Sequence, residues 1–239
     1  MNLFALAPPA ILIDQSVVRT NIIAMQNSAA KAGIRLRPHV KTHKSVTIAQ
    51  WQLDAGAIGI TVAKVGEAEV FANHGFTDIR IAYPVSPLNV SRVLELMEKT
   101  NLSIVVDNET VATLWSERML ASKRKLDVLV KVDVGFHRCG INPIKTDAAS
   151  FVSRIATLPG LKLRGLLSHA GHSYAAESRH EIAEIAKKEA RSLDEIAKHA
   201  KNMGTKIEEL SVGSTPTAQF SLLEKSVTEL RPGNYVFYD

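Results

Sequence analysis

Eight short β-rich runs alternate with longer amphipathic stretches along almost the whole chain, and this alternation restricts the fold more than any other feature. Several runs are continuously apolar, such as Ile104-Val105-Val106, which is typical of parallel strands buried on both faces. The predicted strands cover residues 34–40, 58–63, 79–85, 102–107, 126–134, 164–168, 207–212 and 234–238. Helices are predicted over residues 16–32, 45–53, 65–73, 89–99, 109–122, 147–157 and 177–201.

Eight strands with helices between them predict a (β/α)8 barrel of the TIM type, and an open doubly wound sheet is the alternative. Ser45 is the predicted N-cap of the second helix, and Gly75 is expected to end the third. The length agrees with one barrel domain over residues 1–239, because such a barrel uses about 250 residues.

The composition excludes several classes of protein. Apolar residues make up 46% and charged residues 22% of the chain, as in globular proteins and unlike disordered ones. The net charge of +5 is modest and spread along the chain, so no nucleic-acid partner is predicted. No apolar run approaches the roughly 18 residues of a membrane span. The single cysteine, Cys139, forms no internal disulfide, and the start has no signal-peptide pattern, so a cytoplasmic location is expected.

Chemically active residues follow the predicted strands, where barrel enzymes hold their active sites. The segments concerned have the sequences RPHVKTHK (37–44), DVGFHRCG (133–140), SHAGHSY (168–174), VGSTPT (212–217) and RPGNY (231–235). Five of the eight histidines lie in them. Each segment also has a plain structural interpretation: Lys41 as a surface lysine, 213–215 as a helix cap, or 231–233 as a turn. Their shared position at one end of the barrel favours the functional one.

Two of these features point to one cofactor. Backbone N–H groups in the glycine- and hydroxyl-rich loop at Ser214, and at Gly233 and Asn234, can bind a phosphate. A lysine at the end of the first strand, Lys41, can reach the barrel mouth and form a Schiff base with a carbonyl, if burial and nearby cations keep part of it deprotonated. A phosphate site with a Schiff-base lysine suggests pyridoxal 5′-phosphate.

These motifs resemble the fold-type III pyridoxal-phosphate family, the alanine-racemase-like barrel, and within it the D-threonine aldolase and D-serine dehydratase branch. The resemblance runs from about Pro9 to the end of the chain. It implies that Lys41 is the Schiff-base residue and that Arg138 holds the phenolic oxygen of the cofactor. It places His169 beside the ring and makes Tyr174 a cofactor contact. Positions matching the family's phosphate contacts are Thr215, Gly233 and Asn234. Leu167 departs from the pattern, because a tyrosine is expected there.

The implied site therefore has two groups of residues. The catalytic residues would be Lys41, His169 and Arg138. The cofactor-binding residues would be Lys41, Arg138, His169, Tyr174, Ser214, Thr215, Gly233 and Asn234.

The resemblance also implies features that this sequence lacks. Members of the branch carry a C-terminal β domain with a His and a Cys or Asp that bind a divalent metal, Zn or Mn. This chain ends at Asp239, so we expect no metal ligands in it and no helix after the eighth predicted strand. Residues 10–14 are predicted to form a strand outside the barrel, with partners in that domain. The side left uncovered predicts self-association, as a homo-oligomer (dimer), or that the chain is part of a longer polypeptide.

Three functions are weighed. The first is a lyase acting on small-molecule β-hydroxy-D-amino acids, by aldol cleavage or by loss of water, with pyridoxal phosphate as the electron sink. The second is an amino-acid racemase, which needs a second acid or base. The third is a non-enzymatic pyridoxal-phosphate-binding homeostasis protein, which the length favours. The motifs around Lys41 and at the end of the chain favour the lyase lineage, and little metal-dependent activity is expected of these 239 residues alone.

Overall fold

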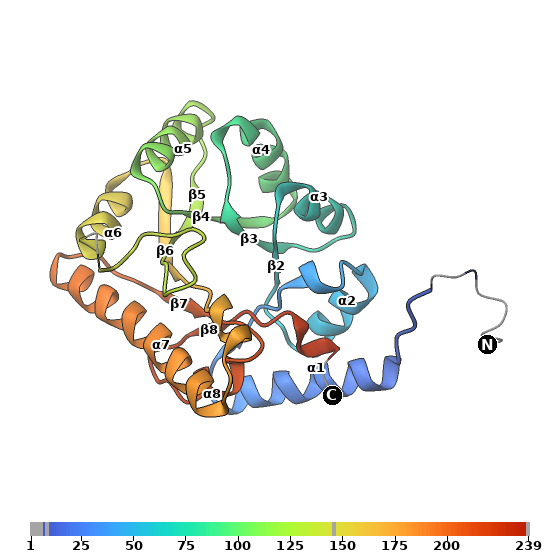
Figure 1. Cartoon of the computed structure of the whole chain (residues 1–239). Coiled ribbons are helices and arrows are strands. Elements are labelled where there is room, and N and C mark those ends of the chain that lie inside the picture. Colours follow the sequence, from blue (N-terminus) through green and yellow to red (C-terminus); the bar gives the residue numbers. More distant parts are fainter. Residues whose placement is uncertain (1–6, 8–9, 145–146, 238–239) are drawn as a thin grey trace.

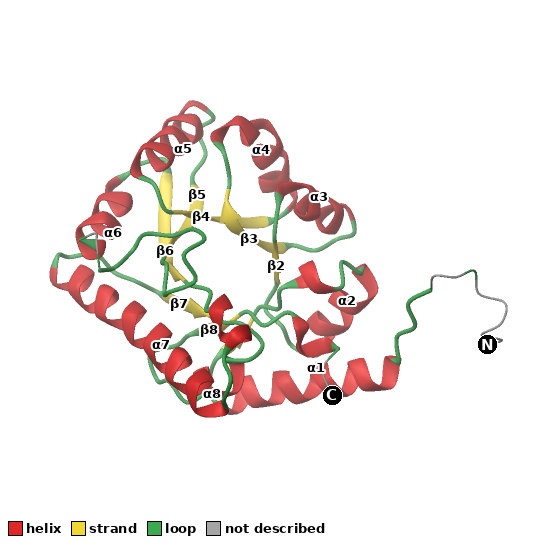
Figure 2. Cartoon of the chain, viewed as in Figure 1, coloured by secondary structure: helices red, strands yellow, loops and turns green. Residues whose placement is uncertain are grey.

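The chain forms a barrel of eight parallel strands with helices around it (Figures 1 and 2). The computed structural model describes residues 7, 10–144 and 147–237. The strands are β1 (Arg35–Leu36), β2 (Ile60–Val62), β3 (Asp78–Pro84), β4 (Asn101–Val106), β5 (Leu126–Lys131), β6 (Leu161–Leu167), β7 (Glu209–Val212) and β8 (Glu229–Leu230). The helices are α1 (Gln15–Lys31), α2 (Val46–Asp54), α3 (Val65–Asn73), α4 (Val90–Lys99), α5 (Glu109–Ala121), α6 (Ala148–Thr157), α7 (Arg179–Asn202) and α8 (Ala218–Ser221).

The strand order is β1-β8-β7-β6-β5-β4-β3-β2. Hydrogen bonds between the segments of β1 and β2, the two ends of this order, close the sheet. The N–H of Ile58 donates to Leu36 O at 3.0 Å, and the N–H of Thr61 donates to Pro38 O at 2.8 Å. The sheet therefore closes on itself, and the predicted TIM-type barrel is confirmed. The predicted N-cap of α2 is confirmed, because the Ser45 hydroxyl accepts from the N–H of Ile48 at 3.3 Å.

The predicted eighth strand, residues 234–238, is wrong. The sheet instead uses Glu229–Leu230, which pairs with both β1 and β7. Pro232 has no N–H to continue the ladder, and the chain then turns through the 3-10 helix η5 (Asn234–Val236). Tyr235 and Val236 are buried against helices rather than in the sheet. The last part of the predicted strand, Tyr238, lies outside the described residues.

The side of the barrel that was expected to lack a covering helix is covered by α1. Val18 and Ile22 of α1 pack with Ile48 of α2 and with Tyr235 and Val236 of η5. Figure 1 shows α1 running along this side, beside the C-terminal end of the chain. The helix that precedes β1 thus takes the place expected for one that follows β8, because both positions adjoin the β1–β8 pair.

The predicted outer strand at residues 10–14 is not observed. Residues 10–13 carry no strand pairing, and Ile11 is 92% exposed. Asp14 instead caps α1, its carboxylate accepting from the N–H of Ser16 at 2.8 Å. No helix in the described part of the chain is both long and apolar enough to cross a membrane.

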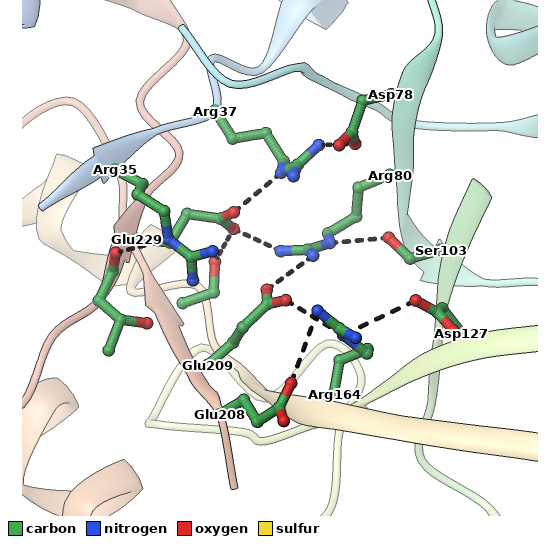
Figure 3. A network of polar contacts seen from close by, with 12 residues as sticks. Arg35, Arg37, Asp78, Arg80, Ser103, Asp127, Arg164, Glu208, Glu209 and Glu229 are labelled. Carbon is green, nitrogen blue, oxygen red and sulfur yellow. Dashed lines mark hydrogen bonds and ion pairs between the residues drawn. The ribbon is translucent and has the colours of Figure 1, made fainter. Parts of the chain in front are cut away.

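Alternate residues of each strand face the barrel interior. These inward-facing residues are charged in one part of the interior and apolar in another. Val105, Leu129 and Leu167, with Ala82, form an apolar cluster separate from the main core. Buried ion pairs occupy the end where the strands begin (Figure 3). Their members are Arg37, Asp78, Arg80, Glu209 and Glu229, with Arg164, Asp127 and Glu208 at the margin.

Replacing Ile22 tests whether α1 belongs to the barrel wall. Ile22 is 2% exposed and Ile23 is 54% exposed. We expect Ile22→Ala to lower the free energy of unfolding by about 2–4 kcal/mol through lost burial and a cavity, and Ile23→Ala to change it by about 0.5 kcal/mol or less. Urea unfolding of both variants measures this, and equal effects would contradict the packing of α1.

Candidate active site

A pocket opens at the carboxyl ends of the strands, and most of the residues singled out in the sequence line it. Its lining comprises His39, Lys41, Ala82, Lys131, Arg138, Leu167, His169, Tyr174, Gly213, Ser214, Arg231, Gly233 and Asn234. Seven of the eight predicted site residues are in this set. Thr215 is the exception; it follows Ser214 in the same loop without lining the pocket.

Lys41 lies in the 3-10 helix η2 (Val40–Thr42), which follows β1 after a short connection at residues 37–39. Its side chain is half-buried, and its pKa is lowered from the ordinary value by burial first, and then by the Arg138 and Arg231 cations. Lys44 and Lys64, in contrast, are exposed. A lowered pKa increases the neutral fraction of the amine, which is the nucleophilic form.

Four cationic side chains meet in this pocket. The sequence assigned a role to two of them, placed Arg231 in a candidate segment without a role, and did not single out Lys131. Besides Lys41 and Arg138, the pocket is lined by Lys131, at the end of β5, and by Arg231, directly after β8. Among the described lining residues there is no Asp or Glu. Such a wall favours an anionic ligand.

Lys131 is buried, and burial together with the Arg231 charge lowers its pKa to about 7. Lys131 stands two residues after Leu129, which faces the barrel interior. Because strand side chains alternate between the two faces, this spacing predicts that Lys131 faces the interior too. The pocket therefore holds a second lysine that is partly neutral at neutral pH.

His169 follows β6 with a fixed ring orientation. Its Nδ1 is 2.9 Å from the carbonyl oxygen of Gly213. A carbonyl only accepts, so Nδ1 carries the hydrogen and Nε2 is left as an acceptor. Burial lowers the pKa of His169 to about 3, although the Gly213 bond opposes the shift. The ring packs edge-on against Phe136, with the centroids 5.7 Å apart. His169 is therefore neutral at ordinary pH.

The two loops predicted to bind phosphate lie on one side of the pocket. The Ser214 hydroxyl is bonded to those of Ser173 at 2.8 Å and Thr217 at 2.9 Å. Thr215 Oγ1 is buried and has no partner among the described residues. Among the described residues, the backbone N–H groups of Thr215 and Gly233 also have no hydrogen-bond acceptor. The loops thus present several donors with no protein acceptor.

The last loop is fastened to the lysine segment. Thr42 Oγ1–H donates to Asn234 Oδ1 at 2.7 Å, which leaves the Asn234 amide N–H groups as donors. A Cβ at Gly233 would lie 2.8 Å from Thr42 Oγ1 and 2.9 Å from His39 O, so glycine is required by the close approach of the two segments. Lys41 and the predicted phosphate contacts are thereby held together.

Arg138 and Tyr174 are the exposed members of the site. Both line the pocket mouth, and the Arg138 guanidinium lies 5.1 Å from the Phe136 ring centroid. Leu167 lines the pocket with its buried side chain where a tyrosine was expected. No group of three or more His, Cys, Asp or Glu side chains arranged to hold a metal ion occurs within the described ranges.

Known proteins with similar sequences and structures share this barrel. The sequence model of the alanine racemase N-terminal domain matches residues 13–239. D-threo-3-hydroxyaspartate dehydratase of Delftia sp. (strain HT23) is 35% identical over 239 residues, which is 100% of this chain and 63% of that protein. D-serine dehydratase of Dictyostelium discoideum is 32% identical over 248 residues, 97% of this chain and 62% of that protein.

A solved structure agrees with this. D-threonine aldolase from Filomicrobium marinum superposes with a TM-score of 0.92 at 29% identity, covering 98% of this chain and 63% of that one. The chain thus spans about three fifths of the length of each of these relatives.

Fold and site together define a (β/α)8 barrel with a cationic pocket at the carboxyl ends of its strands, lined by a half-buried lysine of lowered pKa. The chain belongs to the alanine racemase N-terminal domain family. This is the fold-type III family of pyridoxal-phosphate-dependent proteins that the sequence motifs resemble.

The buried histidines predict how stability depends on pH. Burial lowers the pKa of His43 from 6.5 to about 4. The unfolded chain therefore binds more protons between these values, so stability falls as the pH drops through this window. We expect His43→Asn, which keeps an acceptor for the Ser45 N–H, to remove on the order of 2 kcal/mol of this pH dependence. Urea unfolding from pH 7 to pH 4 measures it. The exposed His180→Asn is the control, and an identical pH slope in all three proteins would refute the prediction.

Proposed function

We propose that this chain is the pyridoxal-phosphate-binding barrel of a lyase that acts on β-hydroxy-D-amino acids, of the D-threonine aldolase or D-serine dehydratase type. The observation that carries the proposal is Lys41, a half-buried lysine of lowered pKa in a pocket whose other charged lining groups are all cations. Relatives named as dehydratases and an aldolase match the chain over almost its whole length, and this supports the reaction class.

The residues of the pocket, and of the loop at Ser214 and Thr215 beside it, fit pyridoxal phosphate. The buried Thr215 hydroxyl and the N–H groups of Thr215 and Gly233 have no protein acceptor in the described part of the chain. A phosphate accepts hydrogen bonds of this kind from loops that follow the last strands of a barrel. Ser214, Gly233 and Asn234 would border the phosphate, and Tyr174 the rest of the cofactor.

Each remaining residue has a role that follows from its charge state. The cofactor supplies an electron sink for the bond that breaks next to the amino group. Lys41 would bind the cofactor covalently through its neutral amine and move a proton. The cation of Arg138 would stabilise the phenolic oxygen as an anion. His169 would accept a hydrogen bond, or a proton, at Nε2.

Two expectations remain predictions. A homodimer is tested by sedimentation of the chain with and without cofactor. A divalent metal is expected to assist the lyase reaction in longer relatives, but no set of described residues here fits one. We therefore assign no step of the reaction to a metal.

Borohydride reduction tests the lysine assignment. The chain is loaded with pyridoxal phosphate, reduced and digested, and the pyridoxyl adduct is located by peptide mass spectrometry. We expect the adduct on Lys41 and its loss in Lys41→Ala, with Lys44→Ala unchanged because Lys44 is exposed and paired with Glu67. An adduct on Lys131, the other lysine of the pocket, would overturn the assignment.

Product analysis tests the reaction class. The loaded chain is incubated with D-threonine, D-serine, D-threo-3-hydroxyaspartate and D-alanine, with and without Mn²⁺ or Zn²⁺. Glycine with acetaldehyde from D-threonine, or pyruvate with ammonia from D-serine, would support the lyase. Racemisation of D-alanine without either product would favour a racemase. Cofactor binding with no turnover of any substrate would agree both with the homeostasis protein and with the low activity expected of these 239 residues alone.

A further inference from the structure

We propose that Ser211 is a positioning residue: its hydroxyl links the pocket residue Arg231 to the buried carboxylate of Glu229, and thereby fixes the Arg231 guanidinium against the ligand. This inference rests on the proposed function in one respect, namely that the ligand of the pocket is pyridoxal phosphate. The link itself joins the ionic network to the pocket by side-chain hydrogen bonds.

Glu229 is the centre of the ionic network (Figure 3). One carboxylate oxygen accepts from Arg37 Nε at 2.8 Å, and the other accepts from Arg80 Nη1 and from the Ser211 hydroxyl. Burial would raise the pKa of Glu229, but the Arg80 and Arg37 charges hold it at about 2. Glu229 is therefore a permanent buried anion whose two oxygens are both occupied.

Arg231 lies two residues further along the chain, in the pocket lining, and has no carboxylate partner within 4.0 Å in the described part of the chain. Its Nη1 donates to Ser211 Oγ at 2.6 Å and to Val212 O at 3.3 Å, and its Nη2 donates to Ser168 O. Its Nε is buried and has no partner among these residues. Only neutral oxygens therefore hold the guanidinium directly.

The direction of the hydrogen bonds at Ser211 is fixed by chemistry. A guanidinium only donates and an ionised carboxylate only accepts, so the Ser211 hydroxyl must accept from Arg231 and donate to Glu229. Both of its bonds are charge-assisted, and such bonds are the strong ones. Arg231 is thus hydrogen-bonded to a buried anion through one hydroxyl. The charges of Glu229 and Glu189 also act on it through space, but no carboxylate bonds to it directly in the described part of the chain.

Removing this hydroxyl should change the pocket as well as the core. In Ser211→Ala the shorter of the two Nη1 bonds is lost, so Nη1 keeps only the 3.3 Å contact with Val212 O, while Nη2 still donates to Ser168 O. The Arg231 charge also acts on both pocket lysines, because it contributes to the lowered pKa of Lys41 and of Lys131. A displaced guanidinium should therefore alter ligand affinity and the pH titration of the pocket.

Ser103 provides a matched control. Its hydroxyl is buried in the same network and accepts from Arg80 Nε at 3.0 Å, but it does not contact Arg231. Ser103→Ala therefore removes one serine hydroxyl and one charge-assisted bond without touching the pocket. If Ser211 were only structural, the two variants would have the same effect: a small loss of stability and an unchanged pocket.

The experiment compares wild type, Ser211→Ala and Ser103→Ala as full chains, with two readouts. In the ligand-free proteins, crystal structures or guanidinium NMR report the orientation of Arg231. In the presence of pyridoxal phosphate, spectrophotometric titration gives the Kd and the pH dependence of the absorption band. We expect Ser211→Ala to reorient Arg231, to raise the Kd by roughly tenfold or more and to shift the pH titration. Ser103→Ala should leave all three within about twofold of wild type.

The outcomes separate this inference from the proposed function. An unmoved Arg231 in Ser211→Ala, or equal effects of the two substitutions on Kd and titration, would overturn the positioning role. If wild type did not bind pyridoxal phosphate, the proposed function would fail, while the ligand-free readout would still decide whether Ser211 positions Arg231. Urea unfolding of both variants checks that their stabilities are comparable.

Discussion

The buried guanidinium of Arg231 sets the constraint on which the site depends. A positive charge inside a barrel has to keep an anion within reach, but a carboxylate in the pocket itself would compete with an anionic ligand. Side chains two residues apart along a strand point to the same side, so Glu229 and Arg231 both face the barrel interior at different depths. Arg231 therefore has an anion nearby, and the pocket itself contains no carboxylate from this segment. The short strand β8, held between β1 and β7, therefore places the anion in the ionic network and the cation in the pocket.

The state of the other pocket residues follows from this arrangement. Cations that share a buried pocket disfavour one another's charges, which agrees with the lowered pKa of Lys41 and the pKa of about 7 for Lys131. Burial keeps His169 neutral, and its bond to Gly213 O directs its free nitrogen. The protein thus provides lysines of lowered pKa and a neutral accepting histidine beside guanidinium cations, which suits a phosphate-bearing carbonyl compound.

The barrel and most of the pocket could be predicted from the sequence, but the ionic network could not. Continuous apolar runs such as 104–106 identify strands clearly, whereas β8 has two residues, one of them charged, and produces no such signal. The apolar run after it packs on α1 and has the composition of a strand, so the pattern predicts the strand there. Lys131 carries no comparable signal of a site residue, because it is the last residue within β5 and does not belong to a loop after a strand. Arg80 and Glu229 look like surface charges until the closed sheet brings them together.

A crystal structure of the chain with pyridoxal phosphate tests the central claim most directly. The account predicts the phosphate between the loop at residues 213–215 and the N–H groups of Gly233 and Asn234, with the carbonyl carbon bonded to Lys41 and with Arg231 in contact with the cofactor. Cofactor bound at the opposite end of the barrel, among Arg35, Arg124 and Arg164, or attached to Lys131, would contradict the account.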